Sequence, residues 1–331
     1  MAPAEFPPVQ APAESHARRI ADELERTAGG RSLGRLGAVG GWIAAAQHSE
    51  IPAPFARARA VVVAGEHGIA RRGVSAWKPE ATRAQAEQIA AGASPVHAAA
   101  RLANASVRLV DEFLDHPTGC IDTEPAMTPE EFEEALALGV QIADSEVDAG
   151  ADILIPGDVG VGNTTVAAAI HGTFTFTEPV EAIGRGSGIN DEVWKTKVAV
   201  IRDAMFRVRG RSADTAGVLT DISGPDFACL VGLIAQAAVR KTPLLIDGAY
   251  VAQAAYVAER LAPGAKRWCM AGQLSPEPSH VGALQALGLT PVLALDMTTG
   301  QAAGALAALP QLNLAAELVG DVLSGAVDKQ P

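Results

Sequence analysis

A glycine-rich stretch, GDVGVGNTT at residues 157–165, combines the residue types that can hold a phosphate group. It follows the apolar run at 153–156 and precedes an alanine-rich segment of helical composition. Glycines allow a tight turn and a close approach to a ligand, while Asn163, Thr164 and Thr165 can cap a helix. The free N–H groups and the dipole of a helix N-terminus favour an anion. The stretch therefore predicts either a phosphate site or a purely structural turn from strand to helix.

A second glycine-rich loop, GRGSGIND, occupies residues 184–191 and is followed by Lys195 and Lys197 on a predicted helix. Flexible backbone beside lysine side chains suits a second wall of a phosphate pocket. A surface loop next to a solvated lysine helix is the alternative. Neither loop has the spacing of the phosphate loop of nucleoside triphosphatases or of the dinucleotide-binding turn, so those two classes are not supported.

Two further segments carry groups that can transfer protons. Glu66 and His67 follow an apolar run, and they can either act as acid and base or orient the loop that they begin. Glu277 and His280 lie in SPEPSH at 275–280, whose prolines either hold these side chains in place or simply start a helix. No GxSxG elbow is present, so a serine hydrolase is not favoured.

The elements that must position these residues form an alternating pattern. Apolar runs of strand length at 61–63, 107–110, 153–155, 244–246 and 292–295 alternate with alanine-rich helical segments. Strands buried on both faces have this composition, which predicts an α/β fold with a parallel, Rossmann-like sheet covered by helices. Several runs end in a carboxylate or a glycine. Ligands of such sheets bind beyond the carboxyl ends of the strands, so we expect the site at that edge.

The segments on either side of this pattern predict a second, smaller unit. Residues 1–14 are rich in proline and are expected to form a flexible arm. Residues 15–50 contain two helical patterns and are expected to form the helices of a small domain. We expect residues 51–300 to form the large α/β domain, and the C-terminal helices of residues 301–331 to pack with the small domain.

The composition of the 331 residues excludes several classes of protein. A net charge of −12 and an aromatic content of 4% disfavour nucleic-acid binding, which needs a basic surface or stacking side chains. Three cysteines, Cys120, Cys229 and Cys269, form no CxxC pair and predict neither a disulfide framework nor a zinc site. The apolar runs at 60–64 and 291–295 are too short to cross a bilayer, and no signal sequence is apparent. We therefore expect a cytoplasmic protein with no membrane partner.

In this order, the motifs resemble the nicotinate-nucleotide:dimethylbenzimidazole phosphoribosyltransferase family, which makes the lower-ligand nucleotide of cobalamin. The similarity extends over residues 32–310. It is carried by EHG at 66–68 with GVS at 73–75, the two glycine-rich loops, IDG at 246–248, EPSH at 277–280 and LDM at 295–297. One such motif would be weak evidence, but six in the family's order are specific. Asp158 stands where the family has a glutamate, one methylene longer.

The resemblance implies transfer of a 5-phosphoribosyl group from nicotinate mononucleotide to 5,6-dimethylbenzimidazole or a related base, with inversion at the anomeric carbon. The products would be α-ribazole 5′-phosphate and nicotinate. The resemblance also implies a homodimer that needs no metal or redox cofactor, as in the family. The implied partners are therefore the nucleotide, a benzimidazole-type base and a second copy of the chain.

The resemblance also implies roles for particular residues. The ribose phosphate would be held by Gly160, Gly162, Asn163, Thr164, Gly186, Ser187 and Lys197, with Asp158 nearby. The base would be held by Ser75, Asp247, Glu277, His280 and Met297.

The chain departs from the family at the catalytic base. The family carries a Gly-Glu-Gly after its last strand, and its glutamate takes the ring proton of the incoming base; Gln301 stands at that position here. An amide takes no proton at neutral pH, and general-base help is worth about 10²- to 10⁴-fold. Three hypotheses stay open. In the first, the enzyme is active and another carboxylate such as Glu66, Asp158 or Asp296 is the base, or no base is needed. In the second, the enzyme transfers phosphoribose to a different acceptor, whose attack needs less deprotonation. In the third, the chain is a non-catalytic paralogue that binds nucleotide or base, with a mixed dimer as one arrangement.

Overall fold

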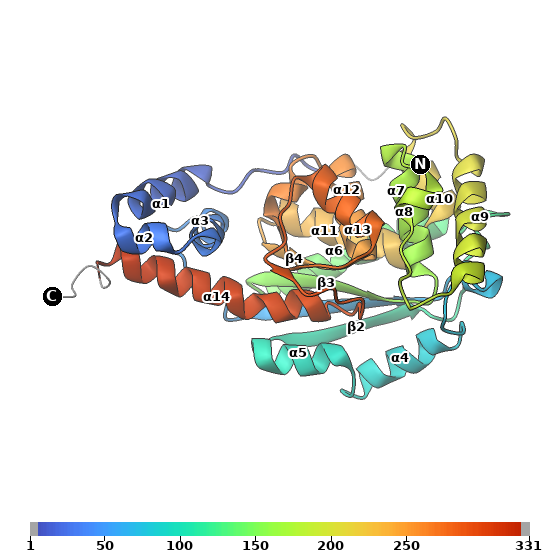
Figure 1. The fold of residues 1–331 in the computed structure, drawn as a ribbon, viewed down its shortest axis with the longest axis horizontal. Coiled ribbons are helices and arrows are strands. Elements are labelled where there is room, and N and C mark those ends of the chain that lie inside the picture. The colour runs from blue at the N-terminus through green and yellow to red at the C-terminus, as the bar shows by residue number, and fades with distance from the viewer. Residues whose placement is uncertain (1–5, 326–331) are drawn as a thin grey trace.

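The computed structural model describes residues 6–325 and places a parallel sheet of five strands at their centre (Figure 1). The strands lie in the order β2-β1-β3-β4-β5, and each neighbouring pair is parallel. They are β1 (Ala58–Gly65), β2 (Ser106–Phe113), β3 (Ile153–Val159), β4 (Leu244–Ile246) and β5 (Cys269–Ala271). After β1, the next strand along the chain, β2, lies on one side of it, and β3, β4 and β5 follow on the other side. Ligands of such sheets bind where the strand order reverses, which here is beyond the carboxyl ends of β1 and β3. The predicted α/β fold with a parallel sheet is confirmed.

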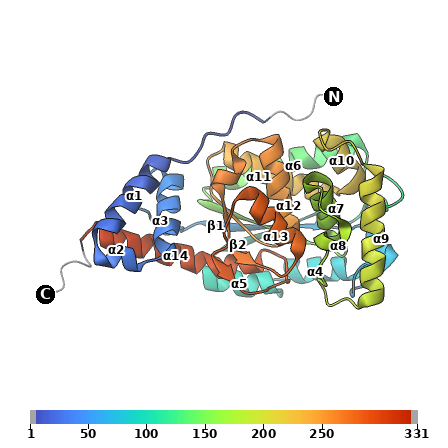
Figure 2. The same cartoon turned by 45° about the horizontal axis from the view of Figure 1, so that its top comes forward.

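Helices cover both faces of this sheet, as Figures 1 and 2 show. One face carries α6 (Pro129–Asp148), α11 (Pro225–Val239) and α12 (Ala249–Leu261), and the other carries α4 (Ala81–Ala90), α5 (Pro95–Ala103) and the start of α14 (Ala303–Leu323). Val61 and Val63 of β1 pack into the first core, whereas Ala60 and Val62 pack into the second. Because successive residues of a strand point to opposite faces, a strand between two cores is apolar throughout.

Several further helices lie near the carboxyl ends of the strands. They are η1 (Gly68–Arg72), α7 (Asn163–Thr175), α8 (Pro179–Ala182), α9 (Asp191–Arg207), α10 (Thr215–Ile222) and α13 (Pro278–Leu287). The short helix η2 (Ala265–Trp268) instead directly precedes β5. The helix α7 begins four residues after β3 ends, and it packs against α9, α12 and α13. The glycine-rich stretch at 157–165 is therefore the predicted connection from a strand to a helix, and the helix that carries Lys197 lies beside it.

The strand assignments differ from the expectation at one edge. Residues 292–295 were expected to join the main sheet, but β7 (Leu293–Ala294) pairs with β6 (Gln273–Leu274) in a separate parallel sheet of two strands. The last strand of the main sheet is β5, which the sequence pattern missed because its residues, Cys-Met-Ala, include no β-branched or aromatic side chain, whereas the equally short β4 is Leu-Leu-Ile. The run at 292–295 is apolar although it is not doubly buried, since Leu295 is exposed. Its apolar composition alone was therefore misleading.

Three helices from the N-terminal part of the chain gather beside the far half of α14 (Figure 1). They are α1 (Glu14–Arg26), α2 (Ala28–Ser32) and α3 (Arg35–Gln47). Ile20 and Leu24 pack with Val319 and Val322 of α14 in a small separate core. The first half of α14 packs instead on the main sheet and on α5. Within the described residues the segment from 301 onward contains this single long helix in place of several, and it links the N-terminal helices to the sheet.

The segment before α1 packs on the body of the protein, which differs from the expected flexible arm. Residues 6–13 form no helix or strand, but the indole N–H of Trp268 donates to the Gln10 carbonyl oxygen at 2.8 Å. Phe6 and Val9 pack against the large core. Apolar side chains among the prolines account for this contact. Residues 1–5 of the predicted arm lie outside the described residues.

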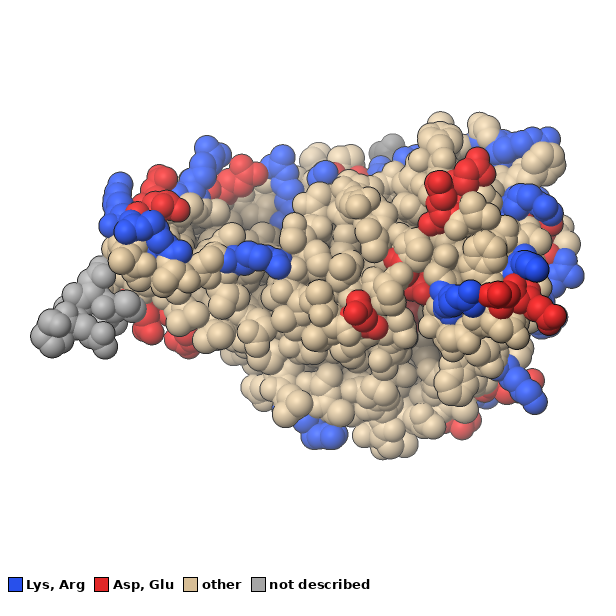
Figure 3. All heavy atoms as spheres, viewed as in Figure 1, with Lys and Arg blue, Asp and Glu red and all other residues tan. Residues whose placement is uncertain are grey.

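Among the described helices, α14 is the one whose length and composition would allow it to cross a membrane. Such helices also occur in protein cores, and the buried residues of α14 pack on the sheet and on the N-terminal helices. Glu317 and Asp321 lie on its exposed side. Figure 3 shows basic and acidic side chains interspersed at both ends of the face drawn there, with no broad basic area.

Candidate active site

A cavity of about 740 Å³ opens where β1, β3 and β4 end. Its walls come from the segments that follow these strands, from the second glycine-rich loop and from residues 297–301. The predicted site residues that line it are Ser75, Asp158, Gly160, Gly162, Asn163, Thr164, Gly186, Ser187, Lys197, Asp247, Glu277, Met297 and Gln301. The structure thus brings together residues that are up to 226 positions apart, Ser75 and Gln301, and of the predicted residues it leaves out Glu66, His280 and Asp296.

The two glycine-rich loops meet at one wall of the cavity. Lys197 of α9 is only 2% exposed, and its Nζ donates to Thr164 Oγ1 in the first turn of α7 at 2.9 Å. A Cβ added at Gly186 would lie 3.8 Å from the same hydroxyl oxygen. Burial lowers the pKa of Lys197, and the negative charge of Glu277 opposes this effect. A buried amine beside a helix N-terminus is an arrangement that can hold an anion.

The first glycine-rich stretch is pressed against the segment that carries Gln301. A Cβ added at Gly157 would lie 2.5 Å from the backbone nitrogen of Ala302, so no larger residue fits there without movement. Gly162, at φ +99°, makes the left-handed turn that starts α7. The backbone N–H of Gln301 donates to the carbonyl oxygen of Asp158 at 3.0 Å. These contacts join the two segments into one wall.

Gln301 stands in a strained piece of backbone. Gly300, Gln301 and Ala302 have φ values of +68°, +58° and +60°, a run of three left-handed residues. The left-handed region costs a non-glycine residue about 1–2 kcal/mol, and such strain gathers at active sites. The Gln301 side chain is 3% exposed; its Nε2 donates to Gln85 Oε1 at 3.5 Å, and its Oε1 has no partner among the described residues. The Gln301 Oε1 is therefore a buried acceptor next to the cavity, without a partner in the described part of the chain.

Three carboxyl groups of the cavity wall are almost fully buried, those of Asp158, Asp247 and Glu277, and burial raises the pKa of the first two. Burial raises the pKa of Asp158 to about 7, and the hydrogen bond that Asn163 Nδ2 donates to its Oδ2 opposes this rise. Burial also raises the pKa of Asp247 to about 6, opposed by Gln273 Nε2, which donates to its Oδ1 at 2.7 Å, and by three backbone N–H groups. A carboxylate with a pKa close to neutrality suits a general base, because it accepts and releases a proton at working pH.

The other two carboxylates considered as the base do not reach the cavity. Glu66 faces a separate cavity of about 90 Å³, and its Oε1 lies 3.7 Å from Arg83 Nε. Asp296 is exposed and does not line the main cavity. Glu66, which was expected to act at the site, therefore lines the smaller cavity and not the main one in this structure. Asp158 and Asp247 are the remaining candidates.

The segment at 275–280 contributes differently from the expectation. Glu277 Oε1 accepts a hydrogen bond from the Gly186 N–H at 2.7 Å, so this carboxylate lies against the second glycine-rich loop. His280 is buried outside the cavity, where its Nδ1 lies 2.8 Å from Ser275 Oγ. Burial lowers the pKa of His280 to about 4. His280 thus orients Ser275, which lines the cavity, while His280, expected at the base, does not itself line the cavity.

Ser75 and Ser187, expected at the base and at the phosphate, are neighbours. Their hydroxyl oxygens lie 3.2 Å apart, and the backbone N–H of Ala76 donates to Ser187 Oγ at 3.1 Å. The segment after β1 is therefore fastened to the second glycine-rich loop across the mouth of the cavity.

Several cavity residues were missed by the sequence analysis. They are Trp77, Gln85, Gln88, Tyr250, Thr298 and Thr299. Gln85 and Gln88 lie three positions apart on α4, so they share a helix face, which the sequence pattern could have indicated. Tyr250 follows the IDG motif at 246–248 by two residues. The other three carried no signal that we can identify.

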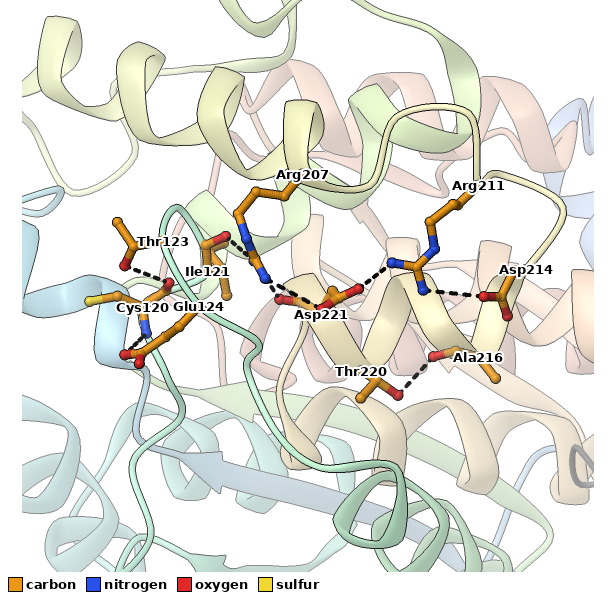
Figure 4. Close-up of polar contacts among 10 residues, drawn as sticks. All are labelled: Cys120, Ile121, Thr123, Glu124, Arg207, Arg211, Asp214, Ala216, Thr220 and Asp221. Atoms are coloured by element: carbon orange, nitrogen blue, oxygen red, sulfur yellow. Dashed lines mark hydrogen bonds and ion pairs between the residues drawn. The ribbon is translucent and has the colours of Figure 1, made fainter. Parts of the chain in front are cut away.

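The helix that carries Lys197 is fastened at its opposite end by a network of ion pairs (Figure 4). Arg207 Nη1 donates to the carbonyl oxygen of Ile121 at 2.7 Å, and Arg207 Nη2 lies 3.4 Å from Asp221 Oδ1. Arg211 Nη1 donates to Asp221 Oδ2 at 2.5 Å and also contacts Asp214. These contacts join α9, α10 and the loop before α6, and they lie outside the cavity. Their role is to hold α9 in place.

Comparison with known proteins points to one family of phosphoribosyltransferases. A family model described as phosphoribosyltransferase matches residues 6–326. The nicotinate-nucleotide–dimethylbenzimidazole phosphoribosyltransferase of Corynebacterium glutamicum is 49% identical over 311 residues, covering 91% of this chain and 86% of that protein. The enzyme of that name from Mycobacterium tuberculosis is 47% identical over 327 residues, covering 94% and 90%.

A solved structure leads to the same conclusion. The crystal structure of CobT from Thermus thermophilus superposes with a TM-score of 0.86 at 32% identity, covering 93% of this chain and 96% of that one. The chain belongs to the nicotinate-nucleotide–dimethylbenzimidazole phosphoribosyltransferase family.

Proposed function

We propose that the protein transfers the 5-phosphoribosyl group of nicotinate mononucleotide to 5,6-dimethylbenzimidazole or a related base, giving α-ribazole 5′-phosphate and nicotinate. The observation that carries this proposal is the meeting of both glycine-rich loops in one cavity, where Lys197 Nζ donates to Thr164 Oγ1 at 2.9 Å. The cavity of about 740 Å³ is large enough to take a nucleotide with a base beside it. Relatives nearly half identical over most of the chain are named for this activity.

The phosphate of the nucleotide is proposed to bind between the two loops. Lys197 supplies the positive charge, and the N-terminus of α7 supplies N–H groups and the positive end of a helix dipole. Gly160, Gly162, Asn163, Thr164, Gly186 and Ser187 complete this part of the wall. Contacts to a phosphate remote from the reacting carbon can hold the ribose in position for attack.

Asp158 is proposed as the general base that replaces the missing glutamate. Of the two buried cavity carboxylates whose pKa is raised, Asp247 already accepts hydrogen bonds from Gln273 and from the backbone N–H groups of Gly248, Gly304 and Ala305. These bonds occupy its oxygens and stabilise its charged form. Asp158 accepts one side-chain hydrogen bond, from Asn163, at Oδ2. Its Oδ1 is therefore the oxygen available to take a proton from a substrate.

The proposed reaction moves one proton and exchanges one bond at the anomeric carbon. A ring nitrogen of the base attacks C1′ of the ribose while the bond from C1′ to the nicotinate nitrogen breaks, and its electron pair returns to the nicotinate ring. The proton on the other ring nitrogen of the base passes to Asp158. Gln301 Oε1, which has no partner among the described residues, can accept a hydrogen bond from the base and orient it. Ser75, Asp247 and Met297 are proposed to line the pocket of the base.

Three further expectations belong to the proposal. The transfer needs no metal or redox cofactor, because the positively charged nicotinate ring leaves readily once the ribose is held. A homodimer and a cytoplasmic location are proposed from the resemblance to the family. Glu277 is proposed to order the second glycine-rich loop through its bond from Gly186.

Incubation of the purified protein with nicotinate mononucleotide and 5,6-dimethylbenzimidazole tests the function. Liquid chromatography with mass detection should show α-ribazole 5′-phosphate and nicotinate forming in equal amounts. Product with another base, such as adenine, but none with dimethylbenzimidazole would support an altered acceptor. Tight binding of nicotinate mononucleotide with no product from any base would contradict the proposal and favour a non-catalytic paralogue.

A further inference from the structure

A buried threonine joins the two parts of the cavity wall that the proposed function assigns to different substrates. Thr82 is the second residue of α4 and is 1% exposed. Its Oγ1 accepts a hydrogen bond from the backbone N–H of Val161 at 2.9 Å in the protein interior. Val161 lies in the first glycine-rich stretch, 79 positions further along the chain. The bond therefore connects α4 to the turn where we place the phosphate.

The helix α4 belongs to the side of the cavity where we place the base. Gln85 and Gln88 of this helix line the cavity, and Gln85 Oε1 accepts the hydrogen bond from Gln301 Nε2. Gln85 follows Thr82 by three residues, so the two side chains are neighbours on the helix surface. A movement of the first turn of α4 would therefore carry Gln85 with it and alter its contact with Gln301.

The turn at the other end of the bond belongs to the side of the phosphate. Val161 stands between two glycines that line the cavity, Gly160 and Gly162. The N–H of Asn163 donates to the carbonyl oxygen of Gly160 at 3.3 Å, a contact within the turn that leaves its distance from α4 open. In the described part of the chain, the bond to Thr82 is the one hydrogen bond that joins this turn to α4. The hydroxyl of Thr82 thus ties the two parts together.

The anchoring of α4 does not depend on this bond. Ala86 and Ile89 pack into the core between the helix and the sheet, and Arg83 Nη2 donates to the carbonyl oxygen of Leu114 at 2.8 Å. The small cavity of about 90 Å³ lies beside the bond and is lined by both bonded residues. Without the hydroxyl, the buried N–H would lose its partner, which is unfavourable. The small cavity gives the turn and the helix room to move apart, so the loss should shift them and leave the fold intact.

We propose that Thr82 is a positioning residue of the transfer, whose hydroxyl sets the distance between the base at α4 and the ribose phosphate at the turn. The inference rests on the proposed function. Thr82 does not line the main cavity, so it acts through Val161 on one side and Gln85 on the other. Attack on C1′ requires the ring nitrogen to be held close and in line, and a misplacement of about 1 Å can cost about 100-fold in rate.

Two substitutions at this position separate the hydroxyl from the shape of the side chain. Thr82→Val replaces the hydroxyl by a methyl group of similar size, whereas Thr82→Ser keeps the acceptor oxygen. We expect Thr82→Val to lower kcat by about 10- to 100-fold. The Kd of nicotinate mononucleotide should change by less than about threefold, because each substrate keeps its own contacts. Thr82→Ser should keep kcat within about threefold of the wild type.

Thr173→Val is the matched control for the loss of a buried hydroxyl. Thr173 is also a buried helical threonine, but its Oγ1 donates to the carbonyl oxygen of Ala169 in its own helix, α7, at 2.8 Å. It does not line the main cavity, so kcat should stay at the wild-type value. Thermal unfolding of each variant verifies that it is folded before its kinetics are measured. Thr82→Ala, which also removes the acceptor, takes the place of Thr82→Val if the valine variant does not fold.

Crystal structures test the geometry without any assay of activity. The distance from the Cα of Gln85 to the Cα of Gly162 should be the same in the wild type and in Thr82→Ser. In Thr82→Val it should be longer by up to about 1 Å. An equal distance in all three proteins would overturn the inference.

The kinetic outcomes separate this inference from the proposed function. A Thr82→Val variant with wild-type kcat, or a Thr82→Ser variant that loses as much as Thr82→Val, would overturn the role of the hydroxyl. A weaker Kd of the nucleotide at unchanged kcat would do the same, because the bond would then support only the phosphate loop. In these cases the wild type still forms α-ribazole 5′-phosphate, and the proposed function stands. If the wild type forms no product, the proposed function fails and the inference fails with it.

Discussion

Replacing Lys197 by methionine separates ligand binding from stability more sharply than any other change at this site. The side chain is 2% exposed, and its Nζ donates to Thr164 Oγ1 at 2.9 Å, where we place the phosphate. A hydrogen bond to a charged group contributes about 1.5–3 kcal/mol, which corresponds to roughly a 10- to 150-fold loss of affinity. We therefore expect Lys197→Met to weaken the binding of nicotinate mononucleotide by about 100-fold.

The same change should not destabilise the empty protein. Burial lowers the pKa of Lys197, which means that folding opposes the charged form of this amine. Methionine has a similar shape and no charge, so the free energy of unfolding without ligand should be unchanged or higher. Loss of ligand binding together with retained stability is a combination that a misfolded variant does not produce.

Thermal unfolding with and without nucleotide measures both quantities in one assay. At a concentration 100 times the wild-type Kd, the nucleotide stabilises the wild type by about 2.7 kcal/mol, but a variant with a 100-fold weaker Kd by only about 0.4 kcal/mol. At about 2.1 cal/mol/K per residue, a chain of 331 residues gains roughly 1.4 °C per kcal/mol. The Tm should thus rise by about 4 °C in the wild type and by less than about 1 °C in the variant.

Lys195→Met is the matched control, because Lys195 lies on the same helix but is exposed. It should respond to the nucleotide as the wild type does. The reasoning would be refuted if Lys197→Met bound the nucleotide within about threefold of the wild type, or if Lys195→Met lost binding to the same extent.

Three other predictions follow from the cavity wall. Gln301→Glu should change kcat by less than about tenfold if Asp158 already supplies the base; a gain of roughly a hundredfold in the product assay would show that the base is missing. Gly157→Ala should lower the free energy of unfolding by about 1–3 kcal/mol in urea titrations, because its Cβ would lie 2.5 Å from Ala302 N; an unchanged midpoint would mean that the wall yields easily. Asp158→Asn should raise stability at pH 8 by up to about 4 kcal/mol, a gain that vanishes near pH 4. Burial raises the pKa of Asp158 from 3.8 to about 7. The contribution of this carboxyl group to the free energy of unfolding is therefore fully present below about pH 4, and it is lost as the pH rises to about 7. A difference that is independent of pH would show that Asp158 does not titrate in this range.

The strands and the glycine-rich loops could be predicted because local chemistry determines them. Val61 to Val63 form an unbroken apolar run since helices cover both faces of β1, and Gly162 supplies the left-handed turn before α7. The edge of the sheet could not be predicted in the same way. The strand β5 has three residues, and the run at 292–295 pairs with β6, which depends on long-range contacts that no local pattern encodes.

The acid and base groups were predicted in part for the same reason. Glu66 and Asp158 both follow buried strands, and nothing in their neighbouring residues distinguishes them. The structure does, since Asp158 is buried in the cavity wall while Glu66 lies beside Arg83 in another cavity. The bond from Gly186 to Glu277 joins residues 91 positions apart, so the placement of Glu277 could not be read from the chain. Raised pKa values depend on burial in three dimensions, which the order of residues along the chain does not show.

The claim that Asp158 serves as the base in place of the missing glutamate is tested most directly by comparing the kcat of wild type and Asp158→Asn. Formation of α-ribazole 5′-phosphate is measured at saturating nicotinate mononucleotide and 5,6-dimethylbenzimidazole, and the Kd of the nucleotide is measured in parallel. We predict turnover by the wild type and a loss of about 10²- to 10⁴-fold in the variant, with the Kd of the nucleotide changed by less than about threefold. Equal kcat values for the two proteins would contradict the account.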